Sequence, residues 1–253
     1  QYVSAGLILI HMARQDNDCK FCLGDLKGGL DKTESKRILG LGIPAGLQNA
    51  IFAVANLFIQ GAVNSFDSVM VEGNSAAANA DAIIYNVMAA FYTACSTFMG
   101  QNMGAGKRDR MLKSYFIGIT YSFVAGAVLG GALFLFGREF LSLFANDEAV
   151  IEAGLQRTRI MCFSYAVSAF MDCTIAACRG IGKSLAPTVI VIMGSCVFRV
   201  AWIYTVFACF RTIPSLYLLY IFSWTITAIA EIICFTIYYK KLKMKQDISV
   251  CPS

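Results

Sequence analysis

Six long apolar segments between residues 38 and 240 constrain this chain more than any other feature. A helix needs about 20 mostly apolar residues to cross the hydrocarbon core of a bilayer. Three of the segments contain no charged residue, and the other three contain one each. The sequence therefore predicts an all-α, polytopic transmembrane bundle, with spans at 38–66, 82–106, 114–137, 160–178, 184–210 and 212–239.

The composition agrees with this prediction. The chain is 57% hydrophobic and only 15% charged, with a mean hydropathy of +0.62, whereas soluble domains carry about 25% charged residues. A net charge of +5 is compatible with a nucleic-acid partner. The basic residues instead gather at the ends of the spans, as membrane topology requires. We therefore expect the lipid bilayer as partner, and no nucleic acid.

The loops between the spans predict the orientation of the chain. Alternate loops place 16 basic residues on one side and four on the other, and the basic side is normally cytoplasmic. Residues 14–37 are then a cytoplasmic linker and residues 241–253 a cytoplasmic tail. The opposite side has loops at 66–81, which includes Asp81, and at 138–159, which includes Arg157.

The start of the chain is also apolar. The segment 2–12 is too short to span a bilayer, and no basic stretch precedes it, as one would in a signal peptide. We interpret residues 1–13 as the remnant of a preceding transmembrane helix.

The cysteines and motifs indicate neither an enzyme nor a metal protein. Seven of the ten cysteines lie inside spans, where they act as small apolar residues. Cys19 and Cys22 form one C-x-x-C, but a zinc site needs a second pair or histidines, and the one histidine is His11. The sequence has no HExxH, Walker A or GxSxG motif. We expect no catalysis, no cofactor and no metal site.

The first span carries polar side chains on one face. Asn49, Asn56, Gln60 and Asn64 fall within a sector of roughly 80° at about 100° per residue. Pro44 precedes them by about one turn and can kink the helix, exposing carbonyls to a cavity. This face predicts either the wall of a substrate cavity or hydrogen bonds between helices. Its length and regularity favour the cavity.

The fourth span carries the best candidate for ion coupling. Ser164, Ser168 and Asp172 are spaced i, i+4 and i+8, and Tyr165 precedes Asp172 by seven residues, so they share one face. A carboxylate within a membrane is functional by default. We expect Asp172 to carry a proton or a cation, with Tyr165 and Ser168 at the cavity. The alternative is a structural bond to Arg199 or to a neighbouring helix.

The last two spans each hold one charge. Arg199 keeps its proton and so cannot act as a proton carrier. It can pair with Asp172 or Glu231 or contact an anion, and we favour a structural pair. Glu231 follows Ser223 and Thr227 at helical spacing. We expect a structural or gating role for Arg199 and Glu231, as for Pro44.

Glycines in the third span predict close helix packing. Gly126 and Gly130 form a GxxxG pattern, which lets neighbouring backbones approach.

Four segments together resemble the C-terminal half of the multidrug and toxic compound extrusion (MATE) family. Their order and their match to the span boundaries carry the resemblance, which covers about residues 33–245. The segments are GIPAGLQ (42–48), GQNMGAG followed by Lys107 and Arg108 (100–108), RGIG with Pro187 (179–187) and FRVAWIY (198–204).

The resemblance implies a fold and a function. Family members have twelve helices in two six-helix lobes that rock to open a central cavity to either side of the plasma membrane. They export small cationic amphipathic drugs in exchange for H⁺ or Na⁺. Residues 38–240 would be the C-terminal lobe of such a transporter, in a bacterial inner membrane. Its partner would be the N-terminal six-helix lobe, which this chain lacks.

The resemblance also bears on the coupling ion. In several members the C-lobe cation site uses one acid on the seventh helix and one on the tenth, which are the first and fourth spans here. Asp172 fits the acid of the tenth helix. The first span has amides and no acid, so the choice between H⁺ and Na⁺ stays open.

Two other functions remain as alternatives. One is a lipid-linked oligosaccharide flippase of the same superfamily, which needs a strongly cationic cavity. The other is a membrane bundle that does not transport, or an inactive fragment. A single lobe lacks one wall of its cavity, so we expect no transport without a partner lobe.

Overall fold

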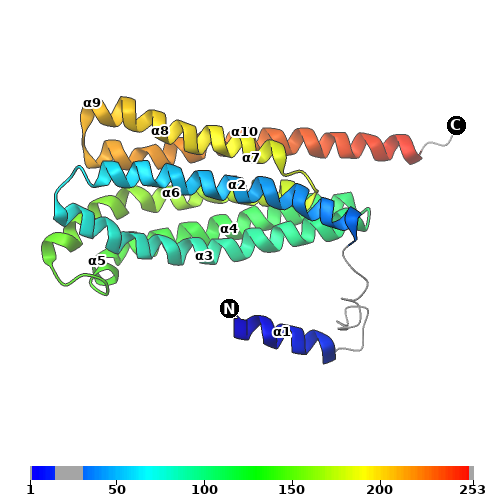
Figure 1. Cartoon of the computed structure of the whole chain (residues 1–253), viewed down its shortest axis with the longest axis horizontal. Helices are drawn as coiled ribbons and strands as arrows, with labels where there is room; N and C mark the ends of the chain where they lie inside the picture. Colours follow the sequence, from blue (N-terminus) through cyan, green and yellow to red (C-terminus); the bar gives the residue numbers. More distant parts are fainter. Residues whose placement is uncertain (1, 15–30, 251–253) are drawn as a thin grey trace. The chain divides into compact units, whose positions relative to one another are not determined.

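The computed structural model describes residues 2–14 and 31–250, and every regular element in these ranges is helical (Figure 1). The chain divides into two compact units, residues 1–40 and 41–253. Six helices in the described ranges are long and apolar enough to cross a membrane, which confirms the all-α prediction with six spans. Five of them are α2 (Lys32–Val63), α3 (Ser68–Gly104), α4 (Arg108–Leu135), α6 (Glu148–Gly180) and α10 (Ile213–Val250).

The remaining span is a composite helix over Leu185–Phe210. Two π-helical segments interrupt it, one on each side of a short α-helical piece. Its parts are α7 (Leu185–Val191), η2 (Ile192–Val197), α8 (Phe198–Trp202), η3 (Ile203–Phe207) and α9 (Ala208–Phe210). Single π turns inside a helix are rare and occur frequently at functional sites.

Two helices begin earlier than the sequence predicted. α3 starts at Ser68, where the side chain of Asp67 caps it by accepting from Met70 N at 2.9 Å. α6 starts at Glu148, after Asp147 caps it in the same way. The loops predicted at 66–81 and 138–159 are therefore mostly helix, and both Asp81 and Arg157 lie inside helices. The predicted loop boundaries were wrong because a single charged residue is typical of a loop. The sequence does not show that Asp81 and Arg157 neutralise each other inside the bundle.

α6 is the central helix of the second unit. It packs against α3, α4 and α10, and it is the most buried of the six spans. Glycines make this packing close: a Cβ added at Gly130 would lie 2.6 Å from the carbonyl oxygen of Cys162, and one at Gly73 would lie 2.7 Å from Gly154 N. A Cβ at Gly126 would lie 3.2 Å from the carbonyl oxygen of Tyr165. The GxxxG pattern thus brings α4 against α6, as predicted.

α2 is the least buried of the six spans. The helix continues through Pro44. Side chains join it to the rest of the second unit: Arg179 donates to Gln48 Oε1 at 3.0 Å, and Ser184 Oγ donates to the carbonyl of Leu41 at 3.2 Å. Most of the helix surface is free of packing, so α2 forms a loosely held wall.

The segments at the two ends leave the predicted domain boundaries untested. α1 (Tyr2–Arg14) is an apolar helix shorter than a membrane span. Most of the predicted linker, with Cys19 and Cys22, lies outside the described residues. In the first unit, Asp31 caps α2 by accepting from Thr33 N at 2.6 Å and Glu34 N at 3.0 Å. These bonds favour the carboxylate and lower the pKa of Asp31. The predicted tail is helical as far as Val250.

The α4–α6 contact supports a first prediction. Gly130→Ala places a methyl group against the Cys162 carbonyl, so we expect a loss of about 1–3 kcal/mol in stability from overpacking. Gly131→Ala is the matched control, because nothing lies within 4 Å of its added Cβ. Thermal unfolding of the purified chain in detergent measures both. Equal stability of the two variants would contradict the close contact.

Candidate functional site

The second unit contains a cavity of about 510 Å³ whose lining comes from five elements. α2, α3, α6, α8 and α10 each supply side chains to its wall. The lining is Phe52, Asn56, Ile59, Gln60, Val63, Asn74, Ala78, Asp81, Tyr85, Tyr92, Arg157, Met161, Met171, Asp172, Arg199, Tyr220 and Trp224. The wall thus combines aromatic rings with two acids, two arginines and several amides.

The polar face predicted on α2 only partly meets this cavity. Asn56 and Gln60 line it, whereas Asn49 and Asn64 are not among the lining residues. Gln60 donates its amide to Asn64 Oδ1 at 2.9 Å, so these two side chains bond along the helix. The structure therefore places two of the four predicted amides at the cavity.

The polar face predicted on α6 also reaches the cavity only in part. Asp172 lines the cavity, is partly exposed, and makes no hydrogen bond or ion pair with another described residue. Tyr165 and Ser168 are fully buried and lie behind the wall, not on it. Ser168 Oγ donates to the Tyr165 carbonyl at 2.9 Å, and Ser164 Oγ to that of Met161 at 2.6 Å. Both serine hydroxyls are thereby satisfied within the helix, so Asp172 alone of this face offers a free polar group.

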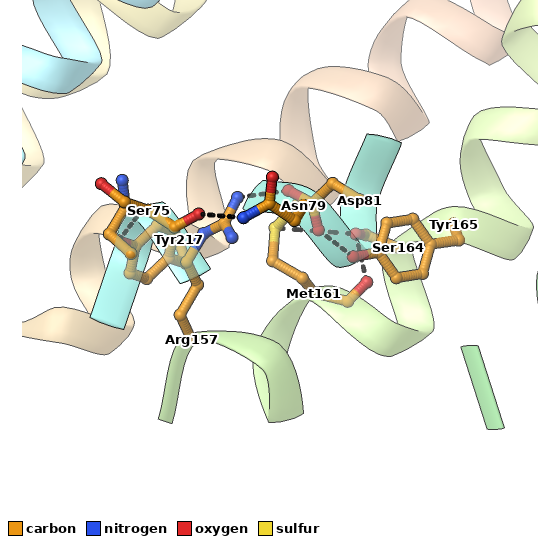
Figure 2. A network of polar contacts seen from close by, with 9 residues as sticks. Ser75, Asn79, Asp81, Arg157, Met161, Ser164, Tyr165 and Tyr217 are labelled. Carbon is orange, nitrogen blue, oxygen red and sulfur yellow. Dashed lines mark hydrogen bonds and ion pairs between the residues drawn. The ribbon is translucent and has the colours of Figure 1, made fainter. Parts of the chain in front are cut away.

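A largely buried polar network joins α3, α6 and α10 at the wall of the cavity (Figure 2). Arg157 donates to one carboxylate oxygen of Asp81, and the Tyr165 hydroxyl donates to the other. The Arg157 guanidinium lies over the ring of Tyr217, 5.4 Å from its centroid. Tyr217 in turn donates to Asn74 Oδ1 at 2.7 Å. The two charges of this network neutralise each other.

Asp81 and Arg157 were not among the site residues that the sequence predicted. A signal was available for Arg157, which precedes Ser164 and Ser168 by seven and eleven residues and so extends the same helical face. The predicted loop boundary at residue 159 cut that face short. Asp81 lies 76 residues away in sequence, and no local pattern connects it to Arg157.

Arg199 is held by aromatic rings. Its guanidinium carbon lies 4.5 Å from the ring centroid of Tyr220, 5.4 Å from that of Phe52 and 5.5 Å from that of Trp224. Its Nε donates to Ser223 Oγ at 3.2 Å. These contacts position the side chain at the cavity wall and offset part of the cost of burying its charge.

The expected salt bridge of Arg199 is wrong. No ion pair between described residues joins it to Asp172 or to Glu231. Asp172 and Arg199 thus line one cavity as two separate, unpaired charges.

Glu231 lies away from the cavity lining. It is fully buried, and neither carboxylate oxygen has a hydrogen-bond partner among the described residues. The charge of Arg179 acts on it electrostatically. Its structural or gating role stays a prediction.

The arrangement suits the binding of an amphipathic organic molecule. Aromatic rings supply stacking surface, and the unpaired acid and arginine supply one charge of each sign. In the described ranges 2–14 and 31–250, no group of three or more His, Cys, Asp or Glu residues is placed to hold a metal ion.

Comparison with known proteins points to one family. The MatE family model matches residues 44–205. A probable multidrug resistance protein of Bacillus subtilis, YpnP, is 30% identical over 132 residues, covering 52% of this chain and 30% of that protein. A second from the same organism, YoeA, is 24% identical over 161 residues, covering 64% and 35%. The matches thus span about a third of these relatives.

Solved structures show the same fold. The structure of MATE in complex with MaL6 superposes with a TM-score of 0.85 at 17% identity, covering 96% of this chain and 55% of that one. With six spans and about half the length of such transporters, the chain has the fold of one of their two lobes.

The Arg157–Asp81 pair supports a second prediction. Asp81→Leu leaves the guanidinium buried without its carboxylate, and we expect a loss of about 3–5 kcal/mol in stability. Adding Arg157→Met should recover most of that loss, because an apolar pair of similar volume avoids desolvating two charges. Thermal unfolding in detergent measures both variants.

The control for this pair is an exposed one. Arg138 pairs with Glu148 where both side chains are more than half exposed, at 53% and 69%, so Glu148→Gln should cost about 0–1 kcal/mol. An Asp81→Leu loss no larger than the Glu148→Gln loss would show that the buried pair does not stabilise the lobe.

Proposed function

Because the chain belongs to the MatE family, we propose that it is the C-terminal lobe of a secondary antiporter that exports organic compounds, with cationic drugs as substrates, in exchange for H⁺ or Na⁺. It acts as a transporter and not as an enzyme. The observation that carries this proposal is the unpaired carboxylate of Asp172 at the wall of an aromatic cavity.

An unpaired acid at this position can couple two ligands. A proton or a cation on Asp172 removes the negative charge that would attract a cationic substrate, so the two compete for one site. Competition of this kind is reciprocal, because each ligand lowers the affinity for the other by the same factor. Exchange then follows when the cavity opens alternately to the two sides of the membrane.

The wall on α2 bears on the choice of ion. Asn56 and Gln60 present amides to the cavity, and no acid of α2 lines it. Amide oxygens are ligands for hard cations, whereas a proton needs Asp172 alone. Either ion is compatible with this wall, and we retain both as coupling ions.

The proposal includes a partner and a location. The N-terminal six-helix lobe would supply the opposite wall of the cavity, and the chain alone would not transport. The location would be the plasma membrane of a bacterium, with the linker and the C-terminus on the cytoplasmic side, following the distribution of basic residues.

Transport assays test the role of Asp172. With the chain expressed as part of a complete two-lobe transporter in an efflux-deficient strain, export of a cationic dye should follow an imposed H⁺ or Na⁺ gradient. Asp172→Asn keeps the shape but cannot change charge, so we expect gradient-driven export to fall by at least about 100-fold, the lower end of the range for loss of a proton-transfer group.

The control is Asp109→Asn, which removes an exposed acid in the first turn of α4 and should export at the rate of the parent. Both variants are compared at equal amounts of protein in the membrane. Export by Asp172→Asn that still responds fully to the gradient would refute the coupling role, and absence of gradient-driven export in the parent would refute the antiporter itself.

A further inference from the structure

We propose that Arg199 recognises an acidic group on the transported compound, so that the cavity selects aromatic ligands carrying a carboxylate or a similar anion. This inference rests on the proposed function for its biological meaning, but it concerns binding and is tested separately from transport.

Arg199 carries a buried positive charge that no carboxylate of the described residues pairs with. Arginine keeps its proton in proteins, and Arg199 is only 2% exposed, inside a membrane-spanning helix. It belongs to no ion pair of the described residues, and its Nη2 has no hydrogen-bond partner. Charged groups at such positions are normally paired or functional.

The two arginines that line the cavity, Arg157 and Arg199, differ in their partners. Arg157 also lines it and also has nitrogens without hydrogen bonds, but the carboxylate of Asp81 matches its charge. Arg199 has aromatic rings and the Ser223 hydroxyl in place of a carboxylate. Of the two arginines lining the cavity, only Arg199 forms no ion pair with a carboxylate of the described residues.

The aromatic rings around Arg199 give the site a shape that suits a flat ligand. Tyr220 and Trp224 hold the planar guanidinium and, with Phe52, also line the cavity. A flat aromatic ligand can stack on these rings while its acidic group meets the guanidinium, which binds carboxylates in a planar, bidentate manner. The π-helical segments η2 and η3 flank the short piece that carries Arg199, an irregularity frequent at functional sites.

Asp172 does not serve as an ion-pair partner of Arg199. Both residues line the cavity, but they form no ion pair. An acidic ligand group would provide Arg199 with the carboxylate that the described residues do not.

The test uses a tryptophan already in the cavity. The chain has two tryptophans: Trp224 lines the cavity, and Trp202, which is not among the lining residues, donates to the Ser215 carbonyl at 2.8 Å. In a Trp202→Phe background, energy transfer from Trp224 to anthracene reports binding to the purified chain in detergent. The probes are anthracenecarboxylate, anthracenemethanol and anthracenylmethylammonium, which share one ring and differ in charge.

We expect the carboxylate to bind at least about tenfold more tightly than the neutral alcohol, as one charge-assisted hydrogen bond provides. Arg199→Gln should abolish this preference, so that the carboxylate and the alcohol bind the variant with similar affinity. Arg199→Lys keeps the charge without the planar fork and should retain part of the preference. It also serves as the informative variant if Arg199→Gln does not fold.

Arg138→Gln, which removes an exposed arginine outside the cavity, is the matched control and should keep the full preference. A carboxylate that binds no better than the alcohol, or a preference that survives Arg199→Gln, would overturn the inference.

The outcomes also separate this inference from the proposed function. Gradient-driven export that depends on Asp172, without any carboxylate preference, leaves the antiporter standing and removes the role of Arg199. If the carboxylate preference depends on Arg199 but no gradient drives export by the two-lobe transporter, the role of Arg199 stands and the antiporter is refuted.

Discussion

The packing of α6 against α3 and α4 is the contact on which the rest of the structure depends. Lipid offers no hydrogen bonds and no hydrophobic drive between helices, so the lobe needs close backbone contact and internal polar partners. Gly73 and Gly130 allow that contact because a Cβ at either position would collide with the backbone of α6. The same helix supplies Arg157, whose charge is neutralised by Asp81 on α3. Small residues and one ion pair therefore fix α6 in the middle of the lobe.

This fixed helix also positions the acid of the cavity. Arg157 and Asp172 lie fifteen residues apart on one face of α6, and both line the cavity. Because a helix is stiff over this distance, the structural pair and the free carboxylate keep a constant separation. The loosely packed α2 forms a different part of the wall. The cavity thus combines a rigid charged side with a side that is held by few contacts.

The sequence was sufficient for the six spans and for the placement of Asp172 and Arg199 in the membrane. It was insufficient for the ends of α3 and α6 and for the partners of the buried charges. Hydropathy scores each residue alone, so Asp81 and Arg157 looked like loop residues, although their pairing makes them tolerable inside helices. The same limit applies to Arg199: a salt bridge was expected, because a sequence does not show that Tyr220 and Trp224 surround the guanidinium.

The charges of the cavity connect the two proposals. Asp81 and Arg157 cancel, so Asp172 and Arg199 determine the potential that a ligand meets. A proton on Asp172 leaves the cavity with one net positive charge, carried by Arg199. A cationic ligand then competes with the proton, which is the requirement for exchange, whereas an acidic group binds best when the proton is present. A compound with both groups would meet both conditions within one cavity. Its effect on the affinity of Asp172 for a proton then depends on whether its cationic or its acidic group binds more strongly. The balance between Asp172 and Arg199 would therefore decide whether ion and substrate move in opposite directions or in the same direction.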